Sequence, residues 1–394
     1  MKQTTEALIK DEYTGAPSKR ALAYVQSKRE NKAPVVGIYC AYAPLELVRA
    51  MDAVPALLCA FANGPIEKAE AVLPSNLCPL IKSSYGFIIS DTCPFFSLSD
   101  AVIAETTCDG KKKMFELITG YKPLHVMDLP QVPDAAEAEQ NWTAMIGKLK
   151  AFLENTFKTT ITDKRIEEEI KDTNEKNRMM RKLFSYASRV PSAIGWSELY
   201  DIIFTATPSS GRDLKPLLDT AFARLEERVA RNECHGAPGA PRVLVTGSPL
   251  GGDATKVFRV IEEAGGVVNA IDNCTGMKCF MDDIEENTGN PLAALARRYL
   301  KIPCSCMTPN RRRLDTMDCL VAQFKPDVVV DVVLHACHSY NIESHKLGKH
   351  VMEKHGLPFL KIVTDYSTGD IEQLRTRIEA VLESARARMS AAGR

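Results

Sequence analysis

Short apolar runs alternate with amphipathic segments over the first third of the chain. The runs lie at 33–40, 54–59, 86–90, 100–105 and 123–129 and are rich in Val, Ile, Leu and Ala. Their length and composition are typical of buried β-strands. Intervening stretches such as APLELVRAM have helical periodicity, so the pattern predicts βαβ units with a parallel sheet. A polar helix is expected before the first run, over residues 5–30.

The pattern changes from about residue 137 to residue 232. This part consists mostly of amphipathic helical sequence rich in Glu, Lys, Arg and Leu, as in TDKRIEEEIKDTNEKNRMMRKLF, and predicts a helical lobe. The Gly/Pro-rich segment NECHGAPGAP (232–241) is typical of a linker. Apolar runs return after it at 241–247, 265–272, 326–334 and 357–365, and DIEQLRTRIEAVLESARARM predicts a final helix.

We therefore predict an α/β protein with two domains. Each domain is expected to hold a small parallel sheet flanked by helices, as in Rossmann-like or flavodoxin-like folds, and a helical lobe is added to them. The expected boundaries are 1–32 for an N-terminal helical segment, 33–136 for the first α/β domain, 137–232 for the helical lobe and 241–394 for the second α/β domain. A chain of 394 residues is long enough for two such cores.

The charge balance narrows the class of function. Fifty basic residues balance fifty acidic ones, which argues against a nucleic-acid or membrane-surface protein. The start, MKQTTEALIKDEY, is charged and lacks the apolar core of a signal peptide, and no run has the length of a membrane span. We expect a cytoplasmic protein.

The chain has twelve cysteines, and in a cytoplasmic protein these are expected to stay reduced. Paired C-x-x-C knuckles of zinc ribbons are absent. Many of the thiols follow predicted strands, and the carboxyl ends of parallel strands form the functional crevice of such sheets. The sequence thus predicts a cleft between the domains that receives thiols from both: Cys40, Cys59, Cys78, Cys93 and Cys108 from the first, and Cys274, Cys304, Cys306 and Cys337 from the second.

Local sequence favours the thiolate form at two of these positions. Cys78 precedes a proline suited to the first turn of a helix, and Cys108 precedes Asp-Gly and three lysines, Lys111–Lys113. A helix N-terminus and nearby cations, including Lys82, stabilise a thiolate, and thiolates are the ligands of iron–sulfur clusters. Each cysteine alone also fits a small buried side chain, as the lysines fit a solvated helix face. Cys234, Cys279 and Cys319 are assigned to the buried-filler class.

Other motifs carry less information. The sequence has no P-loop and no convincing Ser-His-Asp signature. The segment TGSPLGGDATK (246–256) fits either an anion cradle or a tight turn. His335 and His338 flank Cys337, where roles outside the metal's ligand set suit them better than zinc ligation because no matching His and carboxylate cluster accompanies them.

Several long motifs lie in a fixed order between about residues 36 and 380. GIYCAYAPLELVRAM, NLCPLIKSSYGF, ETTCDGKKKMFEL, HACHSYNIE and TDYSTGDIEQLRTRIEA resemble the family of 2-hydroxyacyl-CoA dehydratase and benzoyl-CoA reductase subunits. Within it, the chain resembles the double-cubane cluster protein branch in CPLIKSSYGF, DTCPFF, TTCDGKKKM, DNCTGMK, PCSCMTPN and HACHSYNIES.

The resemblance implies an iron–sulfur centre in the cleft between the two α/β domains. Ordinary members hold one [4Fe–4S] cubane on three cysteines, which correspond to Cys78, Cys108 and Cys337. The double-cubane branch joins two cubanes by a bridging sulfide, as [8Fe–9S], and needs about three further thiolates. For these we expect Cys93, Cys274 and one of Cys304 or Cys306. Cys40 and Cys59 also match the branch.

The resemblance further implies an anaerobic, homodimeric oxidoreductase. It would accept low-potential electrons from a separate ATP-hydrolysing activator, which carries its own [4Fe–4S] cluster, and would reduce a small-molecule substrate. The lysines near Cys108 would dock the activator or offset cluster charge. Two alternatives remain: a 2-hydroxyacyl-CoA dehydratase subunit with a single cubane, and an electron-transfer protein without its own substrate. The candidates for proton transfer are Glu105, His335, His338, Tyr340 and Glu343.

Overall fold

The computed structural model describes residues 17–391 and 393, so the start of the helix predicted over 5–30 lies outside the described residues. Helix α2 (Pro17–Glu30) leads into a sheet of four parallel strands: β1 (Val35–Ile38), β2 (Val54–Leu57), β3 (Ala101–Glu105) and β4 (Leu124–Met127). The strand order is β2-β1-β3-β4. The helices between them are α3 (Leu45–Arg49), α4 (Ile66–Ala69), α5 (Pro79–Ile89), α6 (Pro94–Leu98) and α7 (Asp109–Ile118).

The strand predicted at 86–90 is wrong, because this run is the last part of helix α5. Proline at the first helical position starts α5 directly after Cys78. The helix is buried on almost every side, including Ser83, Ser84 and Gly86. It approaches its neighbour so closely that a Cβ on Gly86 would lie 2.0 Å from the Pro65 carbonyl oxygen. A short apolar run without a polar face does not distinguish a buried helix from a strand.

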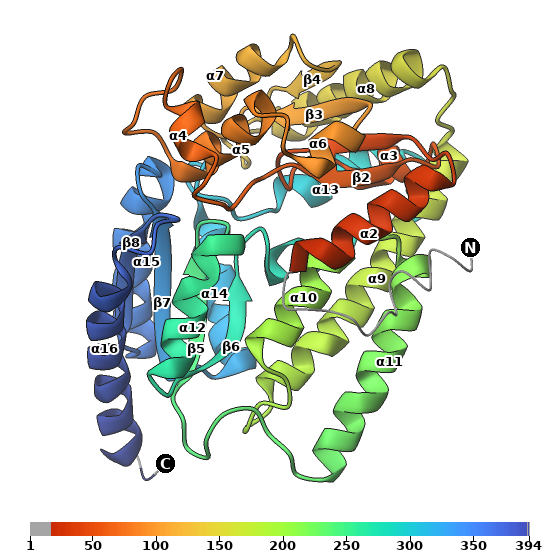
Figure 1. Cartoon of the computed structure of the whole chain (residues 1–394). Helices are drawn as coiled ribbons and strands as arrows, with labels where there is room; N and C mark the ends of the chain where they lie inside the picture. Colours follow the sequence, from red (N-terminus) through yellow and green to blue (C-terminus); the bar gives the residue numbers. More distant parts are fainter. Residues whose placement is uncertain (1–16, 392, 394) are drawn as a thin grey trace.

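The helical sequence in the middle of the chain forms four helices, α8 (Ala138–Phe157), α9 (Asp163–Ser188), α10 (Trp196–Ala206) and α11 (Gly211–Ala230). Hydroxyl caps start two of them, since Thr162 accepts from the Arg165 N–H at 3.3 Å and Ser210 from the Asp213 N–H at 3.1 Å. Helix α8 covers the first sheet, with Trp142 in one core with Val36. Helices α9, α10 and α11 lie side by side below that sheet (Figure 1).

The second sheet repeats the topology of the first. Strands β5 (Arg242–Gly247), β6 (Val267–Asp272), β7 (Val328–Leu334) and β8 (Phe359–Thr364) are parallel and lie in the order β6-β5-β7-β8. Its helices are α12 (Lys256–Glu263), α13 (Pro291–Leu300), α14 (Arg311–Phe324), α15 (His338–His355) and α16 (Ile371–Ala391), with 3-10 turns η1 (Gly252–Thr255) and η2 (Met277–Phe280). The predicted α/β fold with two parallel sheets is confirmed.

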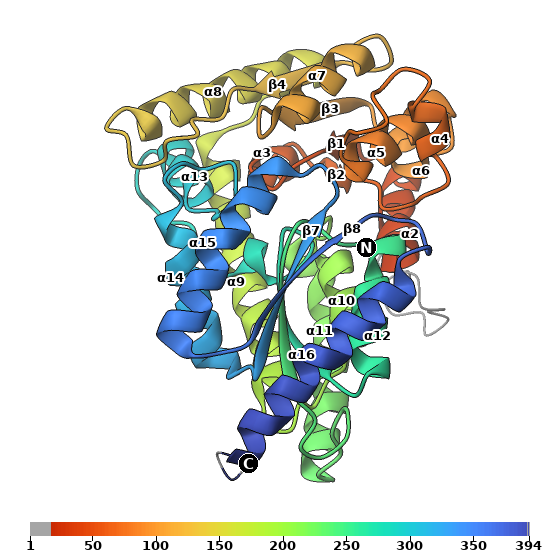
Figure 2. The same cartoon turned by 90° about the vertical axis from the view of Figure 1, so that its left-hand side faces the viewer.

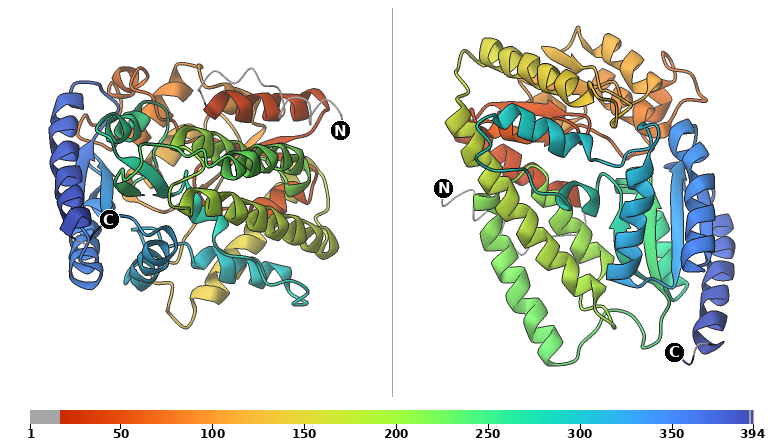
Figure 3. Two further views of the ribbon diagram at one scale, coloured as in Figure 1. Left: turned by 90° about the horizontal axis from the view of Figure 1, so that it is seen from below. Right: turned by 180° about the vertical axis from the view of Figure 1, so that it is seen from behind.

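Two of the contacts between the halves of the chain join the two α/β domains beside the cavity. Helix α13 packs against α8, where Leu295 shares a core with Val36 (Figures 2 and 3). On the opposite side, the Asp253 N–H donates to the Phe61 carbonyl oxygen and the Asn63 N–H donates to Asp253 Oδ2, both at 2.8 Å. The glycine-rich segment 246–256 of the second domain thus contacts the loop of the first domain that contains Phe61 and Asn63.

Each sheet has a topological switch point, between β1 and β3 in the first and between β5 and β7 in the second. Loops that leave adjacent parallel strands in opposite directions open a crevice at such a point. The segments following these four strands contain Cys40, Cys108, Ser248 and Cys337. Among the helices of the described residues, none is both long and apolar enough to cross a bilayer.

Candidate metal centre

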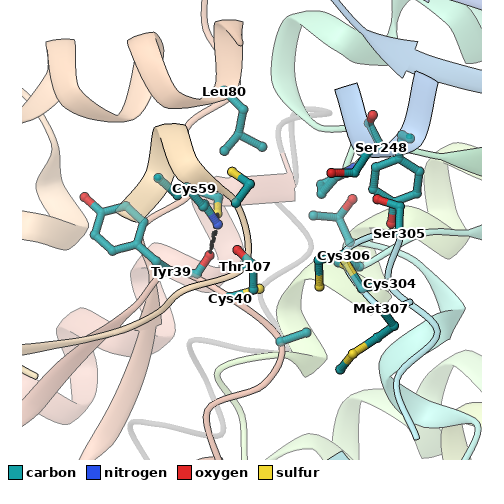
Figure 4. Close-up of a pocket in the computed structure, with 18 of the residues that line it drawn as sticks. Tyr39, Cys40, Cys59, Leu80, Thr107, Ser248, Cys304, Ser305, Cys306 and Met307 are labelled. Atoms are coloured by element: carbon teal, nitrogen blue, oxygen red, sulfur yellow. Dashed lines mark hydrogen bonds between the residues drawn. The ribbon is translucent and has the colours of Figure 1, made fainter. Parts of the chain in front are cut away.

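A cavity of about 720 Å³ lies between the two domains. It is lined by the loops that follow strands of both sheets, and each of the twelve cysteines is a free thiol. In Figure 4, Cys40 and Cys59 lie on one side of the cavity, and Cys304 and Cys306 lie on the other. The cysteines that line it are Cys40, Cys59, Cys78, Cys108, Cys274, Cys279, Cys304, Cys306 and Cys337.

One group of thiols occupies helix N-termini. Cys78, Cys108 and Cys337 are the N-cap residues of α5, α7 and α15. Burial raises the pKa of Cys78 to about 11, although the N–H groups of Leu80 and Ile81 oppose the rise. Burial also raises the pKa of Cys337 to about 12, and the nearby Cys78 and Cys108 raise it further. The Cys337 thiol therefore interacts electrostatically with Cys78 and Cys108 across the boundary between the two domains.

A second group lies around the loop between α13 and α14. Burial raises the pKa of Cys274 to about 12, with Lys278 opposing and Cys304 adding to the rise. The pKa of Cys40 is raised by burial and, in smaller part, by Cys274 and Cys304. A hydrogen bond from the Cys306 thiol lowers the pKa of Cys304. Cys40, Cys274, Cys304 and Cys306 thus form a second set of neighbouring thiols.

The three consecutive lysines of α7 divide between the cavity and the solvent. Lys111 is only 8% exposed, and its Nζ donates to the Tyr39 carbonyl oxygen at 2.8 Å and to Cys59 Sγ at 3.7 Å. Lys112 and Lys113 are exposed and form ion pairs with Asp109 and Glu116. The fourth lysine predicted to act on a thiolate, Lys82, is held by Glu70 at 2.6 Å.

The set of cysteines that line the cavity differs from the predicted ligand set at Cys93 and at Cys279. Cys93 is the N-cap of α6, where its sulfur accepts from the Phe96 N–H at 3.3 Å, and it is not among the residues that line the cavity. Cys279, which was assigned as filler, does line the cavity. Its spacing from Cys274 in DNCTGMKC was the available signal. Cys234 and Cys319 do not line the cavity, but both are exposed, so their assignment as buried filler is wrong.

The family model for the 2-hydroxyglutaryl-CoA dehydratase D-component matches residues 40–385 of this chain. The matched span contains every strand of both sheets except β1 and every cysteine that lines the cavity. The chain belongs to this family. The family predicted from the cysteine motifs is therefore confirmed.

Curated relatives of this D-component family member span nearly the same length. A protein of Escherichia coli (strain K12) named YjiM, a candidate dehydratase subunit, is 41% identical over 91% of this chain and 93% of its own. Lactoyl-CoA dehydratase subunit beta of Anaerotignum propionicum is 24% identical over 90% and 93%, respectively. One of the benzoyl-CoA reductase subunits of Thauera aromatica is 22% identical over 75% and 74%. Relatives of the chain thus carry the names of both dehydratase and reductase subunits.

Three of the five residues predicted for proton transfer in this D-component family member line the cavity: His338, Tyr340 and Glu343. The Tyr340 hydroxyl lies 3.5 Å from Lys278 Nζ. Glu343 accepts from Asn310 Nδ2 at 2.6 Å and pairs with Arg313 at 3.3 Å. His335 is exposed and lies outside the lining residues.

Glu105 lies behind the cavity wall, at the carboxyl end of β3. Neither carboxylate oxygen has a hydrogen-bond partner among the described residues. Burial raises the pKa of Glu105 to about 7, with Lys111 opposing the rise. The carboxyl group is therefore buried beside Lys111 and close to the thiols of Cys40 and Cys59.

The lining residues fit an iron–sulfur centre. Many thiols converge on one buried space, and thiolates are the ligands such clusters require. Without a positive charge, burial favours the protonated thiol. The cationic core of an iron–sulfur cluster would reverse this preference, and its ligation would release the thiol protons. Lys111 and Lys278 add the positive charge that buried thiolates need.

Proposed function

We propose that this chain is the iron–sulfur, electron-accepting component of a reductase of its family. The observation that carries the proposal is that seven of the nine cavity cysteines fall into two groups, one of three and one of four neighbouring thiols. Cys78, Cys108 and Cys337 would hold one cubane. Cys40, Cys274 and one of Cys304 or Cys306 would hold a second, so the donor set favours a double-cubane [8Fe–9S] centre.

When bound, such a centre supplies electrons at low potential to a small-molecule substrate. The chain's own residues would surround this centre with groups that stabilise its charge and with polar side chains. The N–H groups at the starts of α5, α7 and α15 stabilise negative charge on the N-cap sulfurs. Tyr340 and Glu343 present polar groups to the same space, and His338 is also among its lining residues.

The proposal includes two partners. An ATP-hydrolysing activator with a [4Fe–4S] cluster would deliver the electrons, and a second copy of the chain would complete a homodimer. Exposed Lys112 and Lys113 lie on α7, the helix that Cys108 caps, and offer positive charge to an acidic face of the activator.

The second candidate is a 2-hydroxyacyl-CoA dehydratase subunit with a single [4Fe–4S] cubane. The similarity to lactoyl-CoA dehydratase subunit beta favours it. The second group of thiols argues against it, because one cubane on three cysteines leaves Cys40, Cys274, Cys304 and Cys306 without a role. A protein that only transfers electrons would share the thiols and lack turnover.

Iron and acid-labile sulfide analysis of the anaerobically purified protein tests the proposal. We expect about eight irons per chain. Cys40→Ser should lose about half of them, because it removes one ligand of the second group. Cys108→Ser should lose the cubane of the first group, whereas Cys93→Ser should keep all of the iron, since Cys93 is not among the residues that line the cavity.

A content of about four irons in the unmodified protein, with no loss in Cys40→Ser, would contradict the double-cubane proposal. A change in the cluster's EPR signal on addition of an acyl-CoA would then support the dehydratase candidate. Absence of substrate turnover with activator and ATP, at full iron content, would leave the electron-transfer protein.

A further inference from the structure

A second cluster of ligand-type side chains lies on helices α14 and α15, outside the lining of the cavity. Asp318 is on α14, and His350 and His355 are on the last turns of α15. The two helices lie side by side (Figure 2). Both imidazole Nε2 atoms point at the same oxygen, Asp318 Oδ1, at 2.7 Å from His350 and 2.6 Å from His355.

The cluster is shielded from solvent but not sealed. The side chains of Asp318, His350 and His355 are 23%, 19% and 17% exposed. Partial burial favours the neutral carboxyl, but hydrogen bonds from Lys354, His350 and His355 outweigh it and lower the pKa of Asp318 to about 2. The carboxylate is therefore charged at neutral pH, and a water molecule can reach it.

This donor set suits a divalent transition metal. Two imidazole nitrogens and one carboxylate oxygen are frequent ligands of zinc, and water supplies the fourth position. Tetrahedral bonds of about 2.0–2.2 Å place ligand atoms ~3.3 Å apart. The two nitrogens lie 2.6–2.7 Å from the oxygen, so small side-chain shifts would admit the ion. His355 is the last residue of α15, directly before Gly356 in the left-handed conformation.

Among the described residues that contact Asp318, Lys354 has a positively charged side chain that would repel a bound cation. Its Nζ donates to the other carboxylate oxygen, Asp318 Oδ2, at 2.7 Å. The lysine side chain is 56% exposed, so it can turn into solvent when a metal ion arrives. Its charge would lower the affinity for the ion without blocking the site.

We propose that Asp318, His350 and His355 form a binding site for a divalent transition-metal ion of the zinc type, separate from the thiol-lined cavity. The site would tie α15 to α14. Both helices begin at the cavity, since Cys337 caps α15 and Asn310, which precedes α14, donates to the Cys304 carbonyl oxygen at 2.9 Å. The metal ion would fix the far end of α15 to the middle of α14.

The test measures zinc bound to the anaerobically purified protein with its endogenous cluster in place. Equilibrium dialysis against zinc with a competing chelator should give one tightly held zinc per chain. Zinc K-edge absorption should show nitrogen and oxygen ligands only, because a zinc held by stray thiols would show sulfur. Asp318→Asn and His350→Gln should each weaken binding at least about tenfold. His345→Gln, an exposed histidine on the same helix, should leave it unchanged.

Removing the positive charge of Lys354 should strengthen zinc binding, whereas removing a ligand should weaken it. Lys354→Met should bind zinc several-fold more tightly, and Lys349→Met, which removes an exposed lysine paired with Glu353, should not. The proposal is overturned if zinc binds through sulfur, if no zinc binds at micromolar concentration, or if the Asp318 and His350 variants match the unmodified protein. Should Asp318→Asn fail to fold, the zinc spectrum of the unmodified protein and the Lys354→Met affinity still decide.

Discussion

Lys111 and Lys113 are two residues apart on one helix, yet they have opposite surroundings. Lys111 reaches the Tyr39 carbonyl and the Cys59 sulfur inside the protein, and Lys113 pairs with Glu116 in solvent. A buried cation that stabilises nearby thiolates is costly to remove, because it leaves their charge uncompensated. The sequence KKK alone does not show which lysine turns inward.

We expect Lys111→Met to lose iron to a chelator about tenfold faster than the unmodified protein, the equivalent of 1–2 kcal/mol for a charged hydrogen bond. The rate is followed anaerobically as decay of the brown absorbance. Lys113→Met is the matched control, since it removes an equal charge from an exposed position on the same helix. Equal rates for the two variants would show that Lys111 does not act on the thiols.

The cysteines show how far local sequence predicts a site. Cys78 and Cys93 both precede proline and both cap helices, so their local signals are the same. Only Cys78 faces the cavity, because the orientation of the short helix α6 depends on packing that the sequence pattern does not reveal. Cys279 is the reverse case, since it lies in a 3-10 turn and has no cap signal. Of the two predicted ligand sets, all three cysteines of the first line the cavity, whereas Cys93 of the second does not.

At the scale of elements, strands were predicted well because most of them are apolar runs between turns, as at β5 and β7. The failure at α5 has the same origin, since a helix buried on all sides also has an apolar run. The sequence of the glycine-rich turn after β5 fits two interpretations, an anion cradle and a tight turn. The structure shows what constrains it: Gly252 has a φ of +44°, and a Cβ there would lie 2.4 Å from the Phe61 carbonyl oxygen.

Gly252→Ala should therefore destabilise the protein by about 2–4 kcal/mol, from backbone strain combined with overpacking against Phe61. Gly239→Ala is the control, because Gly239 also has a positive φ (+74°) but its Cβ would meet no described heavy atom within 4 Å. It should cost only about 1 kcal/mol. Denaturant unfolding under anaerobic conditions gives both values. If the two variants are equally destabilised, the contact with Phe61 contributes nothing.

At the scale of the whole molecule, two sheets of identical strand order face one cavity from opposite sides. The alternation of strands and helices predicted both sheets. It did not predict that α13, from the second half, completes the core of the first domain beside α8, because that contact depends on long-range packing. The exposed lysines of α7 add a surface on which a partner can act.

The double variant Lys112→Gln/Lys113→Gln should slow activator-dependent reduction of the cluster and flatten its dependence on ionic strength, because exposed charges steer association and salt screens them. Iron content should remain unchanged, since both lysines are exposed. Lys215→Gln, an exposed lysine on α11 paired with Asp219, is the control. A salt dependence identical to that of the unmodified protein would rule out docking through this pair.

Because the cavity thiols come from both halves of the chain, they leave the ribosome at different times during synthesis. Cys78 and Cys108 leave the ribosome more than 150 residues before Cys274 and Cys337. At a rate of ~5–20 residues per second, the first sheet has several seconds to fold around incomplete ligand sets. Iron–sulfur assembly machinery that acted on the nascent chain would find at most half a site. A complete set of the proposed ligands therefore exists only after Cys337 has been synthesised.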